Sequence, residues 1–153
     1  MESALSKLAF AASGAYNGKG HNGIDLAAPI GTPIKAALTG TVVGTGNTDE
    51  VRGCYSFGRW VMIKHGNGLS TMYAHLSQTG VVTGQSVATG QIIGYSGDTG
   101  YATGPHLHFG VYVTAATKII TLGQATNATT PCASAVMPVP TSLNGYLNPM
   151  NYL

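Results

Sequence analysis

Glycine limits what this chain can fold into. It occupies 22 of the 153 positions, about twice its usual share of ~7%, and it divides the β-prone segments into short runs. Only 8% of the residues are charged, against about 25% in a typical globular domain, and this mixture suits short strands and tight turns better than surface helices. We therefore predict a mainly β single domain, 1–153, with one hydrophobic core, long surface loops and little helix.

The β-prone runs follow one another between Pro33 and Val113, and we place the core of the domain at about 14–113. The sequence Gly-Asn-Gly at 66–68 lies between two of these runs and predicts a hairpin turn. A short helix is expected only within residues 1–12. The β-prone segments are 33–44, 59–77, 81–97 and 106–113.

Two segments interrupt this pattern. Residues 45–58 predict a polar loop between strands, and residues 117–145 form a long Ala-, Thr- and Pro-rich stretch within an excursion that we place at 114–145. Loops longer than about 12 to 15 residues are more often functional or disordered than neutral connections. The C-terminal segment, 146–153, is apolar and aromatic enough to dock back on the domain.

The only two cysteines, Cys54 and Cys132, lie one in each of these interrupting segments. Two cysteines are too few for a structural zinc site made of cysteines. They are compatible with a disulfide, which would imply an oxidising compartment, or with two buried reduced thiols. A bond between them would pin both segments against the body of the domain.

Charge and hydropathy exclude several kinds of partner. Five acidic and seven basic residues give a net charge of +2 without a basic cluster, so we expect no nucleic acid partner. No apolar stretch approaches the roughly 20 residues that a membrane span needs. The first 14 residues carry Glu2 and Lys7 and lack the pattern of a signal peptide, so we expect either a protein that stays inside the cell or a mature or excised fragment.

Two histidines, His106 and His108, stand one residue apart at the start of an apolar run. On a strand, residues two positions apart share a face, and their Cα atoms lie about 6.5 to 7 Å apart. This spacing lets one imidazole bind a metal while its neighbour reaches an adjacent ligand. The pattern alone is a weak indication of a metal or catalytic site.

Three further residues are candidates on weaker grounds. His21 and Asp25 lie in a glycine-rich stretch where a helix is improbable, and a straight strand would hold them about 13 Å apart. They can share one ion only if the chain bends at Asn22-Gly23; otherwise they belong to a surface turn. His75 stands near a strand end in an apolar setting that also suits a core histidine, and His65 is interpreted as a structural or solvent-facing residue.

Taken together, His21, Asp25 and one histidine of the pair form a ligand set of mixed nitrogen and oxygen donors. Three protein ligands leave a fourth position open, as catalytic zinc requires, whereas structural zinc is closed by four. Two histidines then remain to handle protons.

Three motifs in this order resemble those of the lysostaphin/LytM-type zinc metallopeptidases, which cut peptide bonds in bacterial peptidoglycan. The motifs are HNGID at 21–25, YAHLS at 73–77 and TGYATGPHLHFGV at 99–111, and the likeness runs from about Gly20 to Val113. The resemblance implies an antiparallel, β-sandwich-like sheet with a substrate groove walled by loops.

The same resemblance implies a role for each candidate residue. One Zn²⁺ ion would be held by His21, Asp25 and His108, while His75 and His106 would orient or deprotonate a water and stabilise the developing oxyanion. The expected partners are stem or cross-bridge peptides of peptidoglycan, and the expected protein is a monomer. Its location would be extracytoplasmic, with this chain a fragment without its export signal, or a lysin delivered without one.

Two other functions compete with a zinc endopeptidase. LytM-like regulators bind and activate cell-wall amidases without catalysis and have lost metal ligands, whereas all five positions are filled here. A structural or carbohydrate-binding β-domain would require three ordered motifs to be coincidental. The sequence leaves open whether Gly-Gly bridges or D-alanyl-diaminopimelate bonds are cut, because the interrupting segments that would wall the groove depart from shorter family members.

Overall fold

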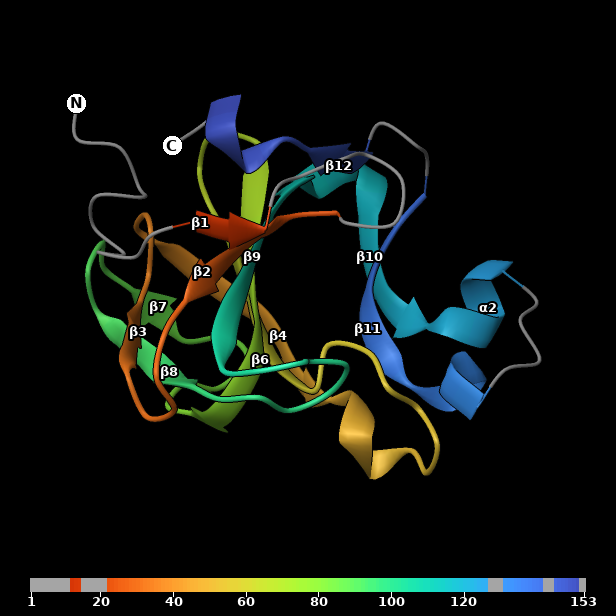
Figure 1. Ribbon diagram of the computed structural model, residues 1–153. Helices are drawn as coiled ribbons and strands as arrows, with labels where there is room; N and C mark the ends of the chain where they lie inside the picture. The colour runs from red at the N-terminus through yellow and green to blue at the C-terminus, as the bar shows by residue number, and fades with distance from the viewer. Residues whose placement is uncertain (1–11, 15–21, 127–130, 142–144, 152–153) are drawn as a thin grey trace.

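The computed structural model describes residues 12–14, 22–126, 131–141 and 145–151. Within them, ten strands join into one antiparallel sheet and two more form a separate small sheet (Figure 1). The only α-helix described is α2, Leu122–Thr126. A mainly β fold with little helix is therefore confirmed. Residues 1–11 of the expected N-terminal helix lie outside the described residues, and Ala12 already belongs to a strand.

The bounds of the strands follow the chain. They are β1 Ala12–Gly14, β2 Ile24–Ala27, β3 Pro33–Lys35, β4 Gly40–Asn47, β5 Arg59–Lys64, β6 Leu69–Thr79, β7 Ser86–Val87, β8 Ile92–Ser96, β9 His106–Val113, β10 Thr117–Thr121, β11 Val136–Pro140 and β12 Tyr146–Leu147. Short 3-10 turns cover Thr48–Glu50, Thr114–Ala116, Pro131–Ser134 and Pro149–Asn151. The expected hairpin turn at 66–68 joins β5 to β6.

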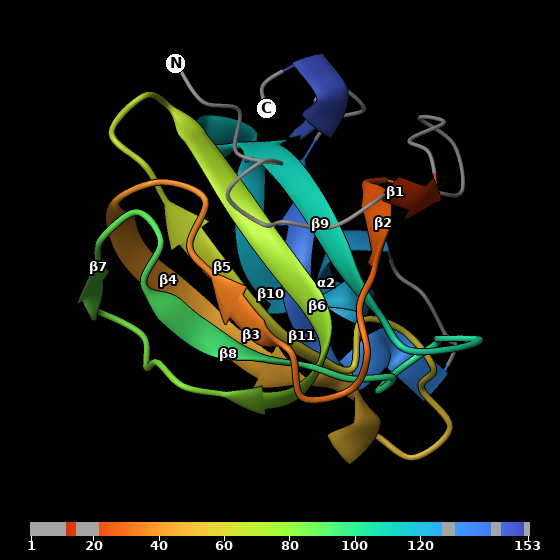
Figure 2. The ribbon, with the colours of Figure 1, turned by 60° about the vertical axis from the view of Figure 1, so that its left-hand side comes forward.

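The central strands run in the order β1-β2-β9-β6-β5-β4-β7. Figure 2 shows β3 and β8 crossing in front of these strands and β10 and β11 behind them. The long strand β6 joins two of these layers, because it pairs with β9 and β5 along its first part and with β8 near its end. The result is the β-sandwich-like arrangement that the sequence predicts.

Alternating residues of the central strands pack against different layers. Leu107, Phe109 and Val111 of β9 face the larger core, which β3 and β8 close. Tyr112 of β9 faces a second core with Trp60 of β5, which is fully buried. The two-residue period of β9 thus assigns its even-numbered residues, including His106 and His108, to the face opposite the larger core.

The segment 117–145, expected as a long loop, contains β10 and β11. The many Thr, Ala and Pro residues of this segment made it look like a loop, although its apolar residues are enough to form two strands. Ile119 packs against the core around Trp60, while Met137 and Val139 belong to a third hydrophobic cluster. The expected loop at 45–58 is also shorter, because β4 extends to Asn47. The C-terminal segment docks through β12, which pairs with β9.

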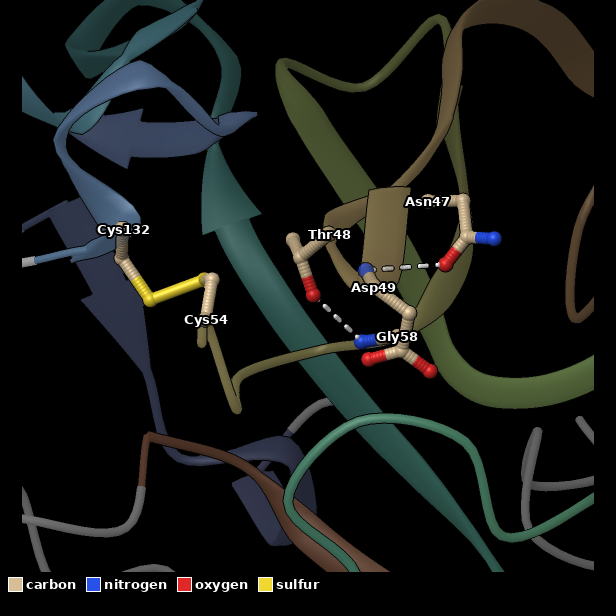
Figure 3. Close-up of a disulfide and its surroundings, with 6 residues drawn as sticks. All are labelled: Asn47, Thr48, Asp49, Cys54, Gly58 and Cys132. Atoms are coloured by element: carbon tan, nitrogen blue, oxygen red, sulfur yellow. Dashed lines mark hydrogen bonds between the residues drawn. A yellow bond between two sulfur atoms is a disulfide. The ribbon is translucent and has the colours of Figure 1, made fainter. Parts of the chain in front are cut away.

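Cys54 and Cys132 form a disulfide across 78 positions of sequence (Figure 3). It joins the β4–β5 loop, 48–58, to the 3-10 turn that precedes β11. The two ends of the loop are joined by Thr48, whose Oγ1 accepts a hydrogen bond of 2.9 Å from the backbone N–H of Gly58. The β4–β5 loop is therefore closed at its base and held near its middle by the disulfide.

His65 is buried in a chain of hydrogen bonds away from the other candidate histidines. Its Nδ1 donates to the carbonyl of Thr39, and its Nε2 accepts from the hydroxyl of Thr71, which in turn accepts from Tyr73. Burial lowers the pKa of His65, so its ring is neutral at pH 7. Of the two interpretations drawn from the sequence, the structural one applies.

No helix in the described part of the chain has the length and apolar character needed to cross a bilayer.

The disulfide gives the first testable prediction. Replacing both cysteines by alanine should lower the free energy of unfolding by about 2 to 4 kcal/mol, because the cross-link restricts a long loop in the unfolded chain. Urea denaturation of the wild type and of the double variant measures this difference. Dithiothreitol should shift the wild-type midpoint and leave that of the variant unchanged; an unaffected wild type would show that no cross-link restrains the loop.

Candidate functional site

Pairing between β2 and β9 places Asp25 directly opposite His108. Both residues lie on the face away from the larger core, since their neighbours Leu26 and Leu107 point into that core. Asp25 Oδ1 is 3.0 Å from His108 Nδ1 and 3.5 Å from His106 Nε2. The carboxylate and both histidines of the pair therefore share one face, as the two-residue spacing of the histidines predicts.

The ring of His108 fits against Gly23. A Cβ atom at position 23 would overlap the carbonyl oxygen of Phe109 and lie 2.9 Å from Nε2 of His108. Only glycine permits β2 and β9 to approach this closely beside the imidazole. The phenyl ring of Phe57, 5.9 Å from the imidazole between centroids, lies near the same ring.

A bulge in β6 brings His75 to the same face. Arg59 pairs with Leu76 and Val61 pairs with Tyr73, so β6 has one residue more than β5 between these pairs. His75 has a φ of 60°, in the left-handed region. Tyr73 and Leu76 both point into the larger core. Residues three positions apart on a regular strand point to opposite faces, so the bulge between Tyr73 and Leu76 must interrupt the alternation. The His75 ring centroid lies 4.7 Å from that of His106.

Backbone carbonyls fix the protonated nitrogen of two histidines. His75 Nδ1 lies 2.7 Å from the carbonyl oxygen of Thr99, and His106 Nδ1 lies 2.8 Å from that of Gly104. A carbonyl oxygen only accepts hydrogen bonds, so Nδ1 carries the proton in each ring. In the neutral form of each ring, Nε2 is consequently the nitrogen without a proton.

Burial also favours the neutral form of His75. Burial is the main cause that lowers the pKa of His75 to about 4, and the neighbouring rings of His108 and His106 act in the same direction. The hydrogen bond to the Thr99 carbonyl and the charge of Asp25 act in the opposite direction. At pH 7 the ring is therefore neutral.

The donor atoms of Asp25 and His108 suit a shared zinc ion. Two ligands of a tetrahedral zinc ion with bonds of about 2.0 to 2.1 Å lie roughly 3.3 Å apart, close to the 3.0 Å between Asp25 Oδ1 and His108 Nδ1. His21, the third ligand predicted from the sequence, lies outside the described residues. Within the described residues, no group of three or more His, Cys, Asp or Glu side chains could hold a metal ion.

These side chains form the floor of an open cavity of about 420 Å³. Residues of the β4–β5 loop and of the loop before β9, 97–105, supply its walls. The lining residues are Asn22, Asp25, Tyr55, Ser56, Phe57, His75, Tyr101, Thr103, His106 and His108. The predicted catalytic pair and two of the three predicted ligands thus meet in one cavity.

The sequence did not reveal the residues that orient this site. Thr99 accepts from His75 through its carbonyl, while its hydroxyl donates to the Leu76 carbonyl and accepts from the Arg59 N–H. Every residue has a main-chain carbonyl, so the residue type does not indicate which carbonyl will orient a histidine. The only signal that could have found them is that Thr99 and Gly104 both lie within the motif at 99–111.

The two wall loops are locked together. The N–H of Tyr101 donates to the carbonyl of Ser56 over 2.7 Å, and the N–H of Gly100 donates to the Asp49 carboxylate. Gly100 has a φ of 72°, and a Cβ there would overlap the Ser56 carbonyl oxygen. Because the disulfide holds the β4–β5 loop, it also braces the loop that supports His75.

The chain belongs to peptidase family M23, which matches residues 19–127. Its resemblance to lysostaphin/LytM-type peptidases is thereby confirmed.

Individual relatives agree with this assignment. The peptidoglycan DD-endopeptidase ShyA of Vibrio cholerae is 44% identical over 119 residues, which are 76% of this chain and 24% of ShyA. The chain therefore spans about a quarter of the length of this relative.

Two solved structures match the fold. The catalytic domain of the antimicrobial peptidase lysostaphin from Staphylococcus simulans superposes with a TM-score of 0.69 at 30% identity, covering 99% of this chain and 98% of that domain. A zinc-containing peptidase from Vibrio cholerae superposes with a TM-score of 0.60 at 36% identity, covering 69% and 34% of the two chains.

The contact between the wall loops predicts unequal effects of two glycine substitutions. Gly100→Ala should lower the free energy of unfolding by at least ~1 kcal/mol, because a left-handed backbone is unfavourable for alanine and the new methyl group overlaps Ser56. Gly104→Ala is the matched control, since nothing lies within 4 Å of a Cβ there. Urea denaturation measures both, and ¹⁵N shifts of the His75 ring should move in Gly100→Ala alone. Equal effects of the two changes would contradict the locking of the loops.

Proposed function

We propose that this protein is a zinc-dependent endopeptidase that hydrolyses peptide cross-links of bacterial peptidoglycan. The observation that carries the proposal is the convergence of Asp25, His108, His75 and His106 on one side of an open cavity. Membership of peptidase family M23 and the similarity to the DD-endopeptidase ShyA support it. The proposed unit is a single peptidase domain, 1–153, acting outside the cytoplasm as a monomer.

In this proposal, His21, Asp25 and His108 hold one zinc ion. The spacing between the Asp25 and His108 donor atoms fits this assignment, and the similar peptidase from Vibrio cholerae contains zinc. The zinc ion, when bound, would supply a Lewis acid for the scissile carbonyl and lower the pKa of a coordinated water towards ~7.

His75 and His106 carry the proton chemistry. Both rings line the cavity, and in this proposal the Nε2 atom of one of them accepts a proton from the attacking water as the water oxygen bonds to the carbonyl carbon. The protonated ring then stabilises the oxyanion through a hydrogen bond without giving up its proton. It transfers that proton to the leaving nitrogen as the carbonyl re-forms and the C–N bond breaks. The Thr99 and Gly104 carbonyls hold the proton on each Nδ1, so Nε2 is the nitrogen left to exchange a proton with the substrate or the water.

Digestion of purified cell walls tests the function directly. The zinc-loaded protein should release new amino termini from walls, and a chelator should abolish the release until zinc is restored. Mass analysis of the products from walls with Gly-Gly bridges and from walls with D-alanyl-diaminopimelate cross-links identifies the bond cut. If zinc-loaded protein released nothing from any wall, an amidase-activating regulator would become the better interpretation.

Substitution of the two neighbouring histidines separates metal binding from proton transfer. His108→Ala should lose most bound zinc, whereas His106→Ala should retain zinc and lose at least ~100-fold in kcat/KM, the usual effect of removing a general acid or base. Zinc content by mass spectrometry and initial rates on the same preparations make the comparison, with circular dichroism as the control for folding. Equal zinc loss in both variants would refute this division of roles.

A further inference from the structure

Two tyrosines stand at the walls of the catalytic cavity with most of their surface exposed. The exposed fraction is 74% for Tyr55 and 72% for Tyr101. Single exposed aromatic residues are common on protein surfaces. These two, however, come from loops 46 positions apart in sequence and line the same cavity as His75 and His106.

Both tyrosines have rigid supports. Tyr55 follows Cys54, which the disulfide holds to the 3-10 turn before β11. The backbone of Tyr101 is bonded to the residue next to Tyr55, because its N–H donates to the carbonyl of Ser56. The relative position of the two tyrosine backbones is therefore set before any ligand binds, which reduces the conformational entropy lost on binding.

Tyrosine suits the recognition of a chain with small side chains. It supplies a large, rigid aromatic surface with a polar tip at a low entropic cost. The cavity, at about 420 Å³, falls in the range that accommodates a compact ligand. Its floor carries the polar groups proposed for the chemistry, and its rim carries the aromatic surface, so the rim is the part that contacts substrate beyond the reacting bond.

We propose that Tyr55 and Tyr101 form an aromatic clamp that binds the cross-link peptide beside the scissile bond by packing on its planar peptide groups. The clamp rests on the proposed endopeptidase function and adds the residues that select its substrate. Contacts of this kind exist before and during the reaction, so they contribute to binding of the substrate more than to the chemical step.

Kinetics on a soluble, cross-linked muropeptide dimer test the clamp. Tyr55→Ala and Tyr101→Ala should each raise KM about 3- to 10-fold, the range expected from losing one aromatic contact, with kcat changed less than about twofold. Tyr55→Phe and Tyr101→Phe should keep the wild-type KM, because the ring remains. Val82→Ala is a control outside the cavity, since Val82 is also a largely exposed apolar residue.

A second readout separates the clamp from the activity. A dimer whose scissile amide is reduced to a secondary amine cannot be hydrolysed, and its Kd for the zinc-loaded protein is measured by calorimetry. Weaker binding by both alanine variants supports the clamp even if the wild type cleaves nothing, in which case only the proposed function fails. Unchanged KM and Kd in an active protein would overturn the clamp alone, and a wild type that neither cleaves nor binds the dimers would overturn both.

Discussion

The break in alternation at His75 is the constraint on which the site depends. Strands β2 and β9 present Asp25, His106 and His108 on one face by ordinary two-residue alternation. Continued alternation along β6 would instead have directed His75 into the larger core with Tyr73. The additional residue in β6 and the left-handed backbone at His75 turn its ring to the face of the other two histidines. Such a backbone is unfavourable for a residue other than glycine, so the surroundings must hold it.

The loops that wall the cavity provide this support. The N–H of His75 donates to the carbonyl of Phe57 on the β4–β5 loop, and its ring donates to the carbonyl of Thr99 on the loop before β9. Gly100 permits the loops to touch, and the disulfide connects the β4–β5 loop to the 3-10 turn that precedes β11. The orientation of the His75 ring and the shape of the cavity wall are thus consequences of the same contacts.

Local patterns predicted some of this arrangement and long-range pairing determined the rest. The spacing of His106 and His108 was sufficient to place them on one face of a strand, and Gly-Asn-Gly was sufficient for the turn before β6. The juxtaposition of Asp25 with His108 depends on pairing between β2 and β9, 83 positions apart in sequence, which spacing alone could not provide. Strands β10 and β11 were missed because their apolar residues are interspersed with Thr and Pro. The orienting carbonyls of Thr99 and Gly104 could not be predicted, because every residue has a backbone carbonyl and its direction depends on the fold.

In the proposed site, His108 and Asp25 bind the metal while His75 and His106 remain available for protons. Anomalous diffraction at the zinc edge, from crystals of the zinc-loaded protein, tests this assignment most directly. We predict one peak within bonding distance of His108 Nδ1 and the Asp25 carboxylate, with the Nε2 atoms of His75 and His106 not bonded to it. A peak bonded to either of these Nε2 atoms, or located away from Asp25, would contradict the account.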